Sequence, residues 1–457
     1  MYEGIWVGED SPIPNTKGYR NDALKALREL KVPVLRWPGG CFADDYHWRD
    51  GIGDPAKRPT LINNNWGGTQ EDNSFGPHEF FNLCEMLGIE PYLSVNIGSG
   101  AVQEAAQWIE YVTAPNGPMA AERAANGRRE PWKLKYVGIG NESWGCGGNM
   151  RPEYYSDVYR RYSTYMRNQP GNTLYRIASG ASDYDYNWTA VLMDGLSLHY
   201  YTAEGWNNKG TATGFDDDKY YSTLGKALEI DTVIRRHIAI MDEKDPKAHV
   251  GLMVDEWGTW YDEEPGTTPG HLFQQNTMRD AMVAALTLDI FHRYSERVRM
   301  ANIAQIANVL QAMWLTKGEK FLLTPTYHVF RMYLPHQDAV NIPLDIKAPV
   351  FKAANGRPVV EFDATASRAA DGSVSISLVN PMLKESDKVA IDLPGIKGLD
   401  IERAEILTAS APQAMNTFEK PDAVAPAPFK DVKAKGSHLD AKLPPLSIVT
   451  ITLRPRK

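Results

Sequence analysis

Seven short apolar runs, separated by longer amphipathic segments, dominate the first two thirds of the chain. The runs have the composition of β-strands and begin near residues 34, 92, 136, 176, 196, 251 and 299. Between them apolar residues recur at helical spacing, as at Leu24, Leu27 and Leu30. Strands that alternate with helices predict βαβ units and a parallel sheet. The expected helices cover residues 21–30, 77–87, 102–112, 154–167, 223–241, 274–293 and 327–333.

Polar residues gather at the carboxyl ends of the predicted strands. They are Arg36 with Trp37, Asn96, Asn141 with Glu142, His199 with Tyr201, Asp255 with Glu256, and Gln305. Active sites of (β/α)8 barrels lie at the carboxyl ends of their strands, so this concentration favours a TIM barrel. A doubly wound open sheet is the alternative, but it would normally carry a glycine-rich nucleotide turn after its first strand.

A closed barrel of this type needs eight strands, and the pattern supplies seven. Tyr2–Val7 is too short, and too closely followed by Pro12, to replace the first strand. We therefore expect the first barrel strand to be missing, with roughly 30–50 amino-terminal residues, judged by the strands that a closed barrel requires. A chain without them is expected to be poorly soluble or weakly active.

The pattern changes after about residue 336, where short and mostly alternating strands replace the βαβ rhythm. Asp371-Gly372 is a hairpin signal between two of them, and the stretch from Ala411 to Pro428 is expected to be a loop. We predict two domains, a catalytic barrel over residues 1–335 and an antiparallel β-sandwich over 336–457. The expected sandwich strands cover residues 359–364, 373–379, 388–393, 401–407 and 446–453.

Two of the barrel runs end in a glutamate beside an aromatic residue. Leu134–Ile139 leads into Gly140-Asn141-Glu142 with Trp144 close behind, and Val250–Val254 leads into Asp255-Glu256-Trp257. A lone glutamate at a strand end is more often a solvated loop residue or a helix cap. Two with matching context indicate chemistry, because glycoside hydrolysis uses a pair of carboxyl groups. The 12 Trp and 22 Tyr fit a sugar-binding cleft, although a large aromatic core explains them equally well.

Composition excludes several other classes of function. A formal charge of −8, without a Lys/Arg block, argues against a nucleic-acid partner. The ten His residues show no metal-ligand spacing, so neither a metal nor another cofactor is expected. The three cysteines, Cys41, Cys84 and Cys146, are odd in number and far apart, and no disulfide framework is expected.

Membrane association is not expected either, because no apolar run reaches membrane-spanning length. No signal peptide is visible at Met1, which favours the cytoplasm. A periplasmic or secreted location stays open because the true amino terminus is expected to be missing.

Several motifs together resemble the glycoside hydrolase family 51 enzymes, the intracellular-type α-L-arabinofuranosidases. The resemblance runs from Tyr2 to about Gln337. It is carried by Arg36–Phe42, Gly140–Gly148, Leu198–Thr202, Val254–Tyr261, Gln274–Thr277, Ala301–Gln305 and Leu323–His328. It implies a (β/α)8 barrel with an accessory sandwich that releases terminal α-L-arabinofuranosyl groups, with retention, from arabinan- or arabinoxylan-type oligo- and polysaccharides. Members of the family are often homo-oligomers, hexamers among them.

The resemblance also implies roles for individual residues. Glu142 would be the general acid/base and Glu256 the nucleophile, at the ends of barrel strands four and seven. These are the third and sixth runs visible here, which agrees with a missing first strand. The substrate-binding residues implied are Asn141, Cys41, His199, Tyr201, Gln305 and Trp257, and Arg36 is implied as an electrostatic support for Glu256.

The chemistry of these residues is consistent with those roles. His199 and Tyr201 lie two apart on one strand and therefore face the same pocket. An arginine near Glu256 favours the carboxylate that attacks the anomeric carbon, whereas Glu142 must carry a proton for the leaving oxygen. Structural roles remain open for three of them: Asn141 as an amide that holds a loop, His199 as a satisfied strand-end residue, and Cys41 as a small buried residue.

Two other functions compete with this interpretation. An endo-glucanase or xylosidase on the same barrel would use the same carboxylate pair and differ only in the shape of the pocket. A non-catalytic sugar-binding relative would usually have lost one carboxylate, and both are present here. Hydrolysis of an aryl α-L-arabinofuranoside, compared with an aryl β-xyloside and a β-glucan, separates these possibilities.

Overall fold

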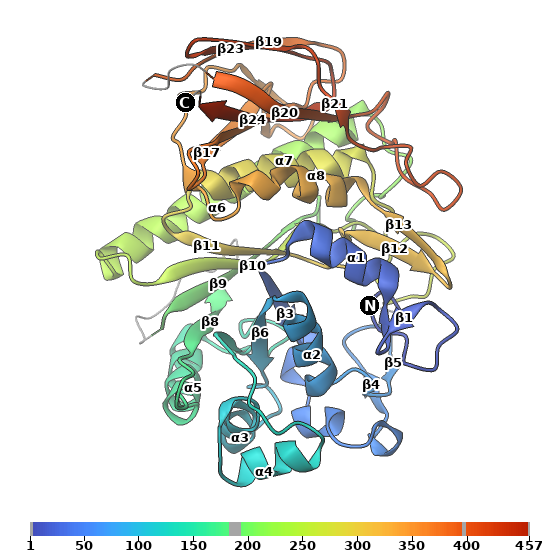
Figure 1. Cartoon of the computed structure of the whole chain (residues 1–457), viewed down its shortest axis with the longest axis vertical. Coiled ribbons are helices and arrows are strands. Elements are labelled where there is room, and N and C mark those ends of the chain that lie inside the picture. Colours follow the sequence, from blue (N-terminus) through green and yellow to red (C-terminus); the bar gives the residue numbers. More distant parts are fainter. Residues whose placement is uncertain (1–2, 182–192, 395–398, 456–457) are drawn as a thin grey trace.

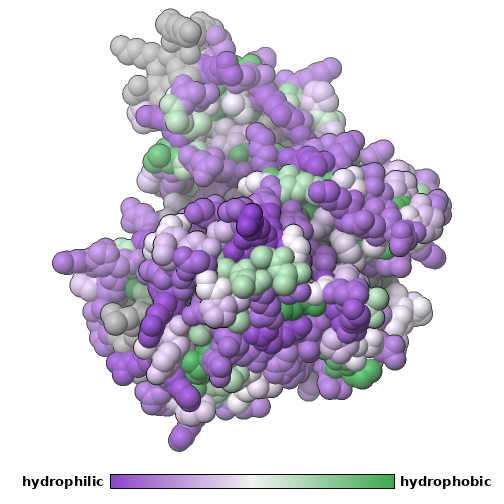
Figure 2. Space-filling view, turned by 60° about the horizontal axis from the view of Figure 1, so that its bottom comes forward, coloured by the Kyte–Doolittle hydropathy of each residue, from purple (hydrophilic) through white to green (hydrophobic). Residues whose placement is uncertain are grey.

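The computed structural model describes residues 3–181, 193–394 and 399–455. It shows a barrel of strands and helices with a β-sandwich stacked on one side (Figure 1). The surface seen in Figure 2 is mostly hydrophilic, and its hydrophobic residues form small separate groups. Within the described ranges, no helix has both the length and the apolar character that crossing a membrane requires.

The barrel is a parallel sheet of seven strands, in the order β11-β10-β9-β8-β7-β6-β3. Its two end strands, β3 and β11, come close to each other, so the sheet is nearly closed. All seven predicted strands are therefore confirmed. They are β3 (Val34–Trp37), β6 (Glu90–Val95), β7 (Tyr136–Ile139), β8 (Tyr175–Ala181), β9 (Gly195–Thr202), β10 (Gly251–Thr259) and β11 (Val298–Ile303).

Helices connect the strands and cover the outside of the sheet (Figure 1). Each of the seven predicted helices is present, with ends that differ by a few residues. α6 is the exception: the side chain of Asp216 caps it, so it begins six residues before the expected Thr223. Helix α4 (Pro118–Ala125) was not predicted. The others are α1 (Asn21–Leu30), α2 (Pro77–Leu87), α3 (Val102–Thr113), α5 (Pro152–Tyr165), α6 (Asp217–Lys244), α7 (Met278–Arg293) and α8 (Pro325–Tyr333).

Side chains fill the barrel at the end opposite Glu142 and Glu256. Tyr92, Ile177, Met253 and Met300 form a buried cluster inside the sheet. Every residue of β10 is buried, because helices pack on one face of the strand and this cluster or the site lies on the other. The barrel is thus a packed core, and room for a site is left only at the carboxyl end of its strands and in the loops that follow them.

Several short elements lie between the main strands and helices, most of them at that carboxyl end. The connection from β3 to α2 contains three 3₁₀ helices and a small hairpin, and a second hairpin follows β11. The 3₁₀ helices are η1 (Cys41–Asp44), η2 (Trp48–Gly51) and η3 (Pro55–Lys57), and η4 (Leu334–His336) follows α8. The small paired strands are β1 (Asn15–Thr16) with β2 (Tyr19–Arg20), β4 (Leu61–Asn63) with β5 (Thr69–Glu71), and β12 (Trp314–Lys317) with β13 (Lys320–Leu323).

The carboxyl-terminal part is an antiparallel sandwich, as predicted. Its larger sheet has the order β14-β17-β18-β24-β20-β21 and its smaller sheet the order β19-β23-β22. The larger sheet comprises β14 (Val340–Asn341), β17 (Asp363–Arg368), β18 (Val374–Asn380), β20 (Leu399–Thr408), β21 (Ala427–Pro428) and β24 (Ser447–Pro455). The smaller comprises β19 (Asp387–Asp392), β22 (Val432–Lys435) and β23 (His438–Leu443).

One predicted sandwich strand is wrong in its extent. Residues 359–364 are divided between β16 (Pro358–Val360), which pairs with β15 (Val350–Lys352), and β17, which belongs to the larger sheet. The chain turns away between them, and the β15–β16 hairpin lies against α6, where Arg357 is ion-paired with Glu229. Strands β22 and β23 were not predicted.

The sandwich is joined to the barrel through α7 and α8. Arg293 at the end of α7 donates two hydrogen bonds to Asp363 of β17, and His292 contacts Thr365 of the same strand. His336 lies between Ser367 and Ser377. This interface lies behind the barrel wall, so the sandwich supports the barrel and contributes none of the predicted site residues.

Candidate active site

Glu256 lies inside β10, opposite His199 of β9, with its side chain directed into the barrel mouth. Two donors hold its carboxylate: Arg36 Nη1 lies 2.7 Å from Oε1 and the Tyr201 hydroxyl 2.8 Å from Oε2. Burial alone would raise the pKa of Glu256, but His199 and Arg36 hold that pKa below its usual value. The group is therefore kept as an anion, the state that a nucleophile requires.

Glu142 lies three residues beyond the end of β7, in the loop that leads to α5. Its φ of +43° is in the left-handed region, which a residue with a side chain adopts only when its surroundings impose it. The backbone N–H groups of Gly145 and Gly147 both donate to the Glu142 carbonyl, at 2.8 and 3.1 Å. This tight turn leaves a carboxylate oxygen of Glu142 within 4.8 Å of one of Glu256.

His199 lies between the two glutamates. Its Nδ1 is 2.9 Å from Glu142 Oε1 and 3.4 Å from Glu256 Oε2, and its Nε2 is 3.3 Å from Asp255 Oδ1. Burial alone would lower the pKa of this imidazole, but the surrounding carboxylates raise it to about 10. The ring is therefore an imidazolium that can donate to both glutamates.

The two glutamates lie close together. One carboxylate oxygen of each, together with a ring nitrogen of His199, fall within 4.8 Å of one another. Enzymes that retain configuration have carboxyl groups about 5–5.5 Å apart, and inverting enzymes need about 6.5–9.5 Å to admit a water molecule. This spacing can serve direct attack by Glu256 on a sugar that Glu142 protonates.

Arg36 and Asn141 connect the two halves of the site. Arg36 Nη2 donates to Asn141 Oδ1 at 2.6 Å, while its Nε donates to Ser94 at 3.1 Å. Asn141 is 1% exposed, and its Nδ2 has no hydrogen-bond partner among the described residues. A buried, unpaired amide beside the two glutamates is suited to donate to a sugar hydroxyl.

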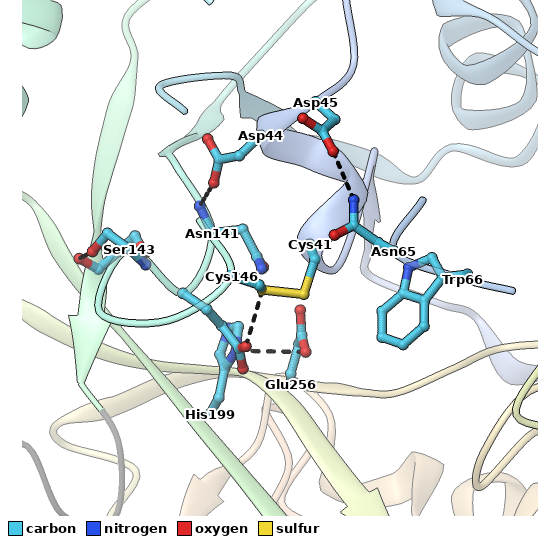
Figure 3. Close-up of a disulfide and its surroundings, with 12 residues drawn as sticks. Cys41, Asp44, Asp45, Asn65, Trp66, Asn141, Ser143, Cys146, His199 and Glu256 are labelled. Carbon is cyan, nitrogen blue, oxygen red and sulfur yellow. Dashed lines mark hydrogen bonds and ion pairs between the residues drawn. A yellow bond between two sulfur atoms is a disulfide. The ribbon is translucent and has the colours of Figure 1, made fainter. Parts of the chain in front are cut away.

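The prediction of no disulfide framework is wrong, because Cys41 and Cys146 form a disulfide at the edge of the pocket (Figure 3). The spacing of 105 residues that argued against it is irrelevant in a barrel, where loops after different strands converge at one end. Cys41 is only partly buried, so it is not the small core residue that was considered as its alternative role. Cys84 is free and buried.

The predicted role of Trp257 in substrate binding is also wrong. Trp257 is 1% exposed and lies on the outer side of β10, where it stacks on Phe330 and packs against Phe291 of the helical layer. The pairing of β10 is irregular around Asp255 and Glu256, so both of these side chains face the inside of the barrel, and Trp257 beyond them faces outward. Trp260, just beyond β10, contacts Tyr201 at the pocket instead, with ring centroids 4.9 Å apart.

Three acidic or aromatic residues near the site were not predicted. Asp255 accepts hydrogen bonds from the hydroxyls of Tyr92 and Ser197, at 2.6 Å each, and its Oδ1 lies 3.3 Å from His199 Nε2. Asp44 accepts the backbone N–H of Asn141. Trp66 lies near Trp260, 6.4 Å between ring centroids. Of these three, only Asp255 could have been found from the sequence, because it stands next to Glu256 near the end of a predicted strand. Asp44 and Trp66 lie in the long loop after β3, where no sequence pattern marks them.

Gln305 follows the end of β11 and is half-buried at the same end of the barrel. Two groups at the site contain residue types that ligate metals: Glu142 with His199 and Glu256, and Cys41 with Glu142 and Cys146. A metal needs a neutral imidazole or a free thiolate. His199 is held as an imidazolium and the two sulfur atoms are joined, so neither group offers a ready ligand set.

Comparison with known proteins agrees with the geometry. Residues 26–219 match the model of the α-L-arabinofuranosidase 1 domain, and residues 255–447 match that of the α-L-arabinofuranosidase C-terminal domain. An intracellular exo-α-L-arabinofuranosidase of Bacteroides ovatus is 58% identical over 99% of this chain and 90% of its own length.

Solved structures give the same result. The family 51 arabinofuranosidase of Xanthomonas axonopodis pv. citri superposes with a TM-score of 0.97 at 50% identity, over 99% of this chain and 94% of its own. The α-L-arabinofuranosidase of Thermotoga maritima, solved as an arabinose complex, superposes with a TM-score of 0.83 at 28% identity, over 99% and 93%. With Glu142 just beyond β7 and Glu256 within β10 meeting at one end of the same barrel, this chain belongs to glycoside hydrolase family 51, the α-L-arabinofuranosidases.

Proposed function

We propose that this protein removes terminal α-L-arabinofuranosyl groups with retention of configuration, with Glu256 as nucleophile and Glu142 as general acid/base. One observation carries the proposal: carboxylate oxygens of the two residues lie within 4.8 Å, and each residue has different support. Glu256 is held as an anion by Arg36 and Tyr201. Glu142 is partly exposed in a loop, where first the leaving group and then a water molecule can reach it.

In the first step, Glu256 attacks the anomeric carbon while Glu142 transfers its proton to the leaving glycosidic oxygen. The carbon–oxygen bond to the leaving group breaks as the ester bond to Glu256 forms. In the second step Glu142, now a carboxylate, takes a proton from a water molecule, which attacks the same carbon and releases Glu256. His199 Nδ1 can donate to whichever glutamate carries the charge, because it lies within 3.4 Å of both.

We propose that the sugar ring is held between Asn141, Tyr201, Gln305 and the Cys41–Cys146 disulfide. The unpaired Nδ2 of Asn141 supports a contact with a sugar hydroxyl next to the reacting carbon. Trp66 and Trp260 supply aromatic faces near the pocket, of the kind that stack on the apolar face of a sugar. The substrates proposed are arabinan- and arabinoxylan-type oligo- and polysaccharides.

A substrate panel tests the activity. Aryl α-L-arabinofuranoside should be hydrolysed far faster than aryl β-xyloside, and β-glucan should not be cut. Faster cleavage of the xyloside or the glucan would assign this barrel to the alternative glycosidase activities. No turnover of any glycoside by folded protein would support the non-catalytic sugar-binding alternative.

An NMR time course tests retention. The first arabinose released should be the α-anomer, before it equilibrates with the β-anomer in solution. Initial release of the β-anomer would disprove the retaining mechanism and with it the role of Glu256 as nucleophile.

We further propose a homo-oligomer in the cytoplasm, built from a barrel domain over residues 1–335 and a sandwich over 336–457. The relative from Bacteroides ovatus is named an intracellular enzyme, which supports the compartment. Disulfides are rare in the cytosol. If thiol trapping in intact cells finds Cys41 and Cys146 as free thiols, the cytoplasm is supported; if it finds them joined, an oxidising compartment is indicated. Light scattering on the purified protein determines the number of subunits.

A further inference from the structure

Both ends of the 3₁₀ helix η1 are attached to the loop that carries Glu142. Its first residue, Cys41, is joined by the disulfide to Cys146, four residues after Glu142. Its last residue, Asp44, accepts the backbone N–H of Asn141, the residue just before Glu142. The two attachments therefore flank Glu142 on either side along the chain (Figure 3).

Asp44 connects three of the loops at the carboxyl end of the barrel. It is 3% exposed; its Oδ1 accepts the N–H groups of Ile97 at 2.7 Å and Gly98 at 3.1 Å, and its Oδ2 accepts that of Asn141 at 2.7 Å. Its backbone carbonyl also accepts the N–H and hydroxyl of Ser99. Within the described residues no Lys, Arg or His forms an ion pair with Asp44, and its carboxylate accepts hydrogen bonds from backbone N–H groups instead.

Glycines allow the surrounding loops to approach this carboxylate. A Cβ atom on Gly98 would lie 2.9 Å from Asp44 Cβ, and one on Gly147 would lie 2.7 Å from Asp44 Oδ2 and overlap the Asn141 carbonyl. Both positions therefore exclude a larger side chain. The loops after β6 and β7 therefore pack closely around Asp44 and fix its position in the site.

The conformation of Glu142 explains why such attachments are needed. Its φ of +43° is not one that a glutamate adopts without external constraint. On the far side of the turn, Cys146 Sγ lies 3.5 Å from Glu142 Oε2, so the disulfide also contacts the carboxyl group itself. Release of either attachment would let the backbone relax and move the carboxyl group away from the leaving oxygen.

We propose that η1 is a clamp for the general acid/base, in which Asp44 and the Cys41–Cys146 disulfide are positioning elements that hold Glu142 in its reactive geometry. This inference rests on the proposed role of Glu142. The clamp acts mainly on proton transfer, because Arg36 and Tyr201 hold Glu256 directly from β3 and β9, and η1 is linked to that support only indirectly, through Asn141, which accepts from Arg36. Its loss should therefore impair substrates whose leaving groups need a proton and spare those that depart without one.

The Asp44→Asn variant tests the first attachment. The amide oxygen that this change introduces can keep the two bonds to Ile97 and Gly98, which leaves the new NH₂ group facing the N–H of Asn141 and removes that bond. We expect kcat/KM for an arabinosyl oligosaccharide to fall roughly 30- to 100-fold, the cost of about 1 Å of displacement, and that for 2,4-dinitrophenyl arabinofuranoside to fall less than about threefold.

Asp45→Asn is the matched control. Asp45 is the next residue, is exposed, and accepts a hydrogen bond from Asn65. The same change of charge there should leave both substrates within about twofold of wild type, as expected for a solvent-screened surface site. Equal losses on both substrates in Asp44→Asn, or no loss on either, would overturn the clamp.

Reduction of the disulfide tests the second attachment in enzyme that is already folded. A water-soluble phosphine and one water molecule convert the disulfide into two thiols and a phosphine oxide. Thiol titration under denaturing conditions should then find three thiols per chain where the oxidised enzyme, with only Cys84 free, has one. We expect a selective and reversible loss on the oligosaccharide; an unchanged ratio of the two substrates would overturn this half of the proposal.

Glu142→Ala distinguishes failure of the clamp from failure of the proposed function. If Glu142→Ala is selective for the leaving group and Asp44→Asn is not, Glu142 is the acid/base and η1 does not position it. If Glu142→Ala itself loses both substrates equally, the assigned role of Glu142 is wrong and the clamp falls with it.

Discussion

Glu256 and Glu142 follow similar apolar runs in the sequence, yet the structure supports them in opposite ways. Glu256 lies within a strand whose nine residues are all buried, and its carboxylate is fixed by Arg36 of β3 and Tyr201 of β9. Glu142 lies beyond its strand, in a glycine-rich loop with a left-handed backbone, and its nearest polar contacts are His199 and Cys146.

This difference corresponds to what each residue must do. A nucleophile keeps one charge state until it attacks, so a rigid strand and permanent donors suit it. An acid/base must gain and lose a proton in every cycle, so it needs contact with solvent and partners that tolerate both states. The barrel provides the first environment through its sheet and the second through its loops.

The largest effect is expected from removal of the strand-held carboxylate. Glu256→Ala should lower kcat more than roughly 10⁴-fold on every substrate, whatever the leaving group, because no other group can form the covalent intermediate. Rates with aryl arabinofuranosides and with an oligosaccharide measure this.

Azide provides the control for Glu256→Ala. A small anion that enters the vacated space should restore turnover and give the arabinosyl azide of inverted configuration. An azide product of retained configuration would mean that the roles of the two glutamates are exchanged.

The strand-held half of the site could be predicted from the sequence. Apolar runs with polar ends identified seven strands, and the alternation of side chains along a strand placed His199 and Tyr201 on one face. The same alternation, applied to Glu256, would have excluded Trp257 from the pocket but also Asp255, which the irregular pairing of β10 turns inward. That error came from reading the family motif without its strand geometry.

The loop-held half could not be predicted in the same way. The disulfide and the Asp44 contacts join residues about a hundred positions apart, and loop paths have no periodicity from which such contacts can be inferred. The glycines after Glu142 were visible, but their purpose depends on what approaches them in space. Sequence patterns therefore singled out Glu142 as the candidate acid/base and gave no account of what holds it.

The second largest effect concerns the loop-held carboxyl group. Glu142→Ala should lower kcat/KM for an oligosaccharide by roughly 10²–10⁴-fold, because its sugar leaving group departs poorly without a proton. With 2,4-dinitrophenyl arabinofuranoside the first step should be nearly unchanged. Added azide should give a product of retained configuration; inversion would contradict the assignment.

A smaller effect is expected from a single donor to the nucleophile. Tyr201→Phe removes the hydroxyl that lies 2.8 Å from Glu256 Oε2 and should lower kcat/KM by roughly 10- to 100-fold, the usual range for a hydrogen bond to a buried charge. Both types of substrate should suffer equally, which separates this change from those in the Glu142 loop.

Tyr200→Phe is the matched control for Tyr201→Phe. Tyr200 is the preceding residue of β9 and faces the helices, where its hydroxyl donates to the carbonyl of Lys226 in α6. The change should affect thermal stability and leave the ratio of the two substrates at the wild-type value. A loss confined to the oligosaccharide in Tyr201→Phe would mean that Tyr201 serves the acid/base and not the nucleophile.

The smallest effect is a pH dependence of stability that arises where the two halves of the site meet, at His199. Its pKa is about 10 in the folded protein and near 6.5 in an unfolded chain. A raised pKa stabilises the fold fully below about pH 6.5, and the contribution is lost as the pH rises from there to about 10.

The unfolding midpoint of wild type should exceed that of His199→Gln by roughly 2–4 °C at pH 6, and the gap should close by pH 10. His438→Gln is the control: Asp392 and Asp440 also raise the pKa of this histidine of the sandwich, but solvent screens those contacts, so its gap should be much smaller than that of His199→Gln. A gap for His199→Gln that stays constant from pH 6 to 10 would show that the ring stabilises the site by packing alone, without the charge that links the two glutamates.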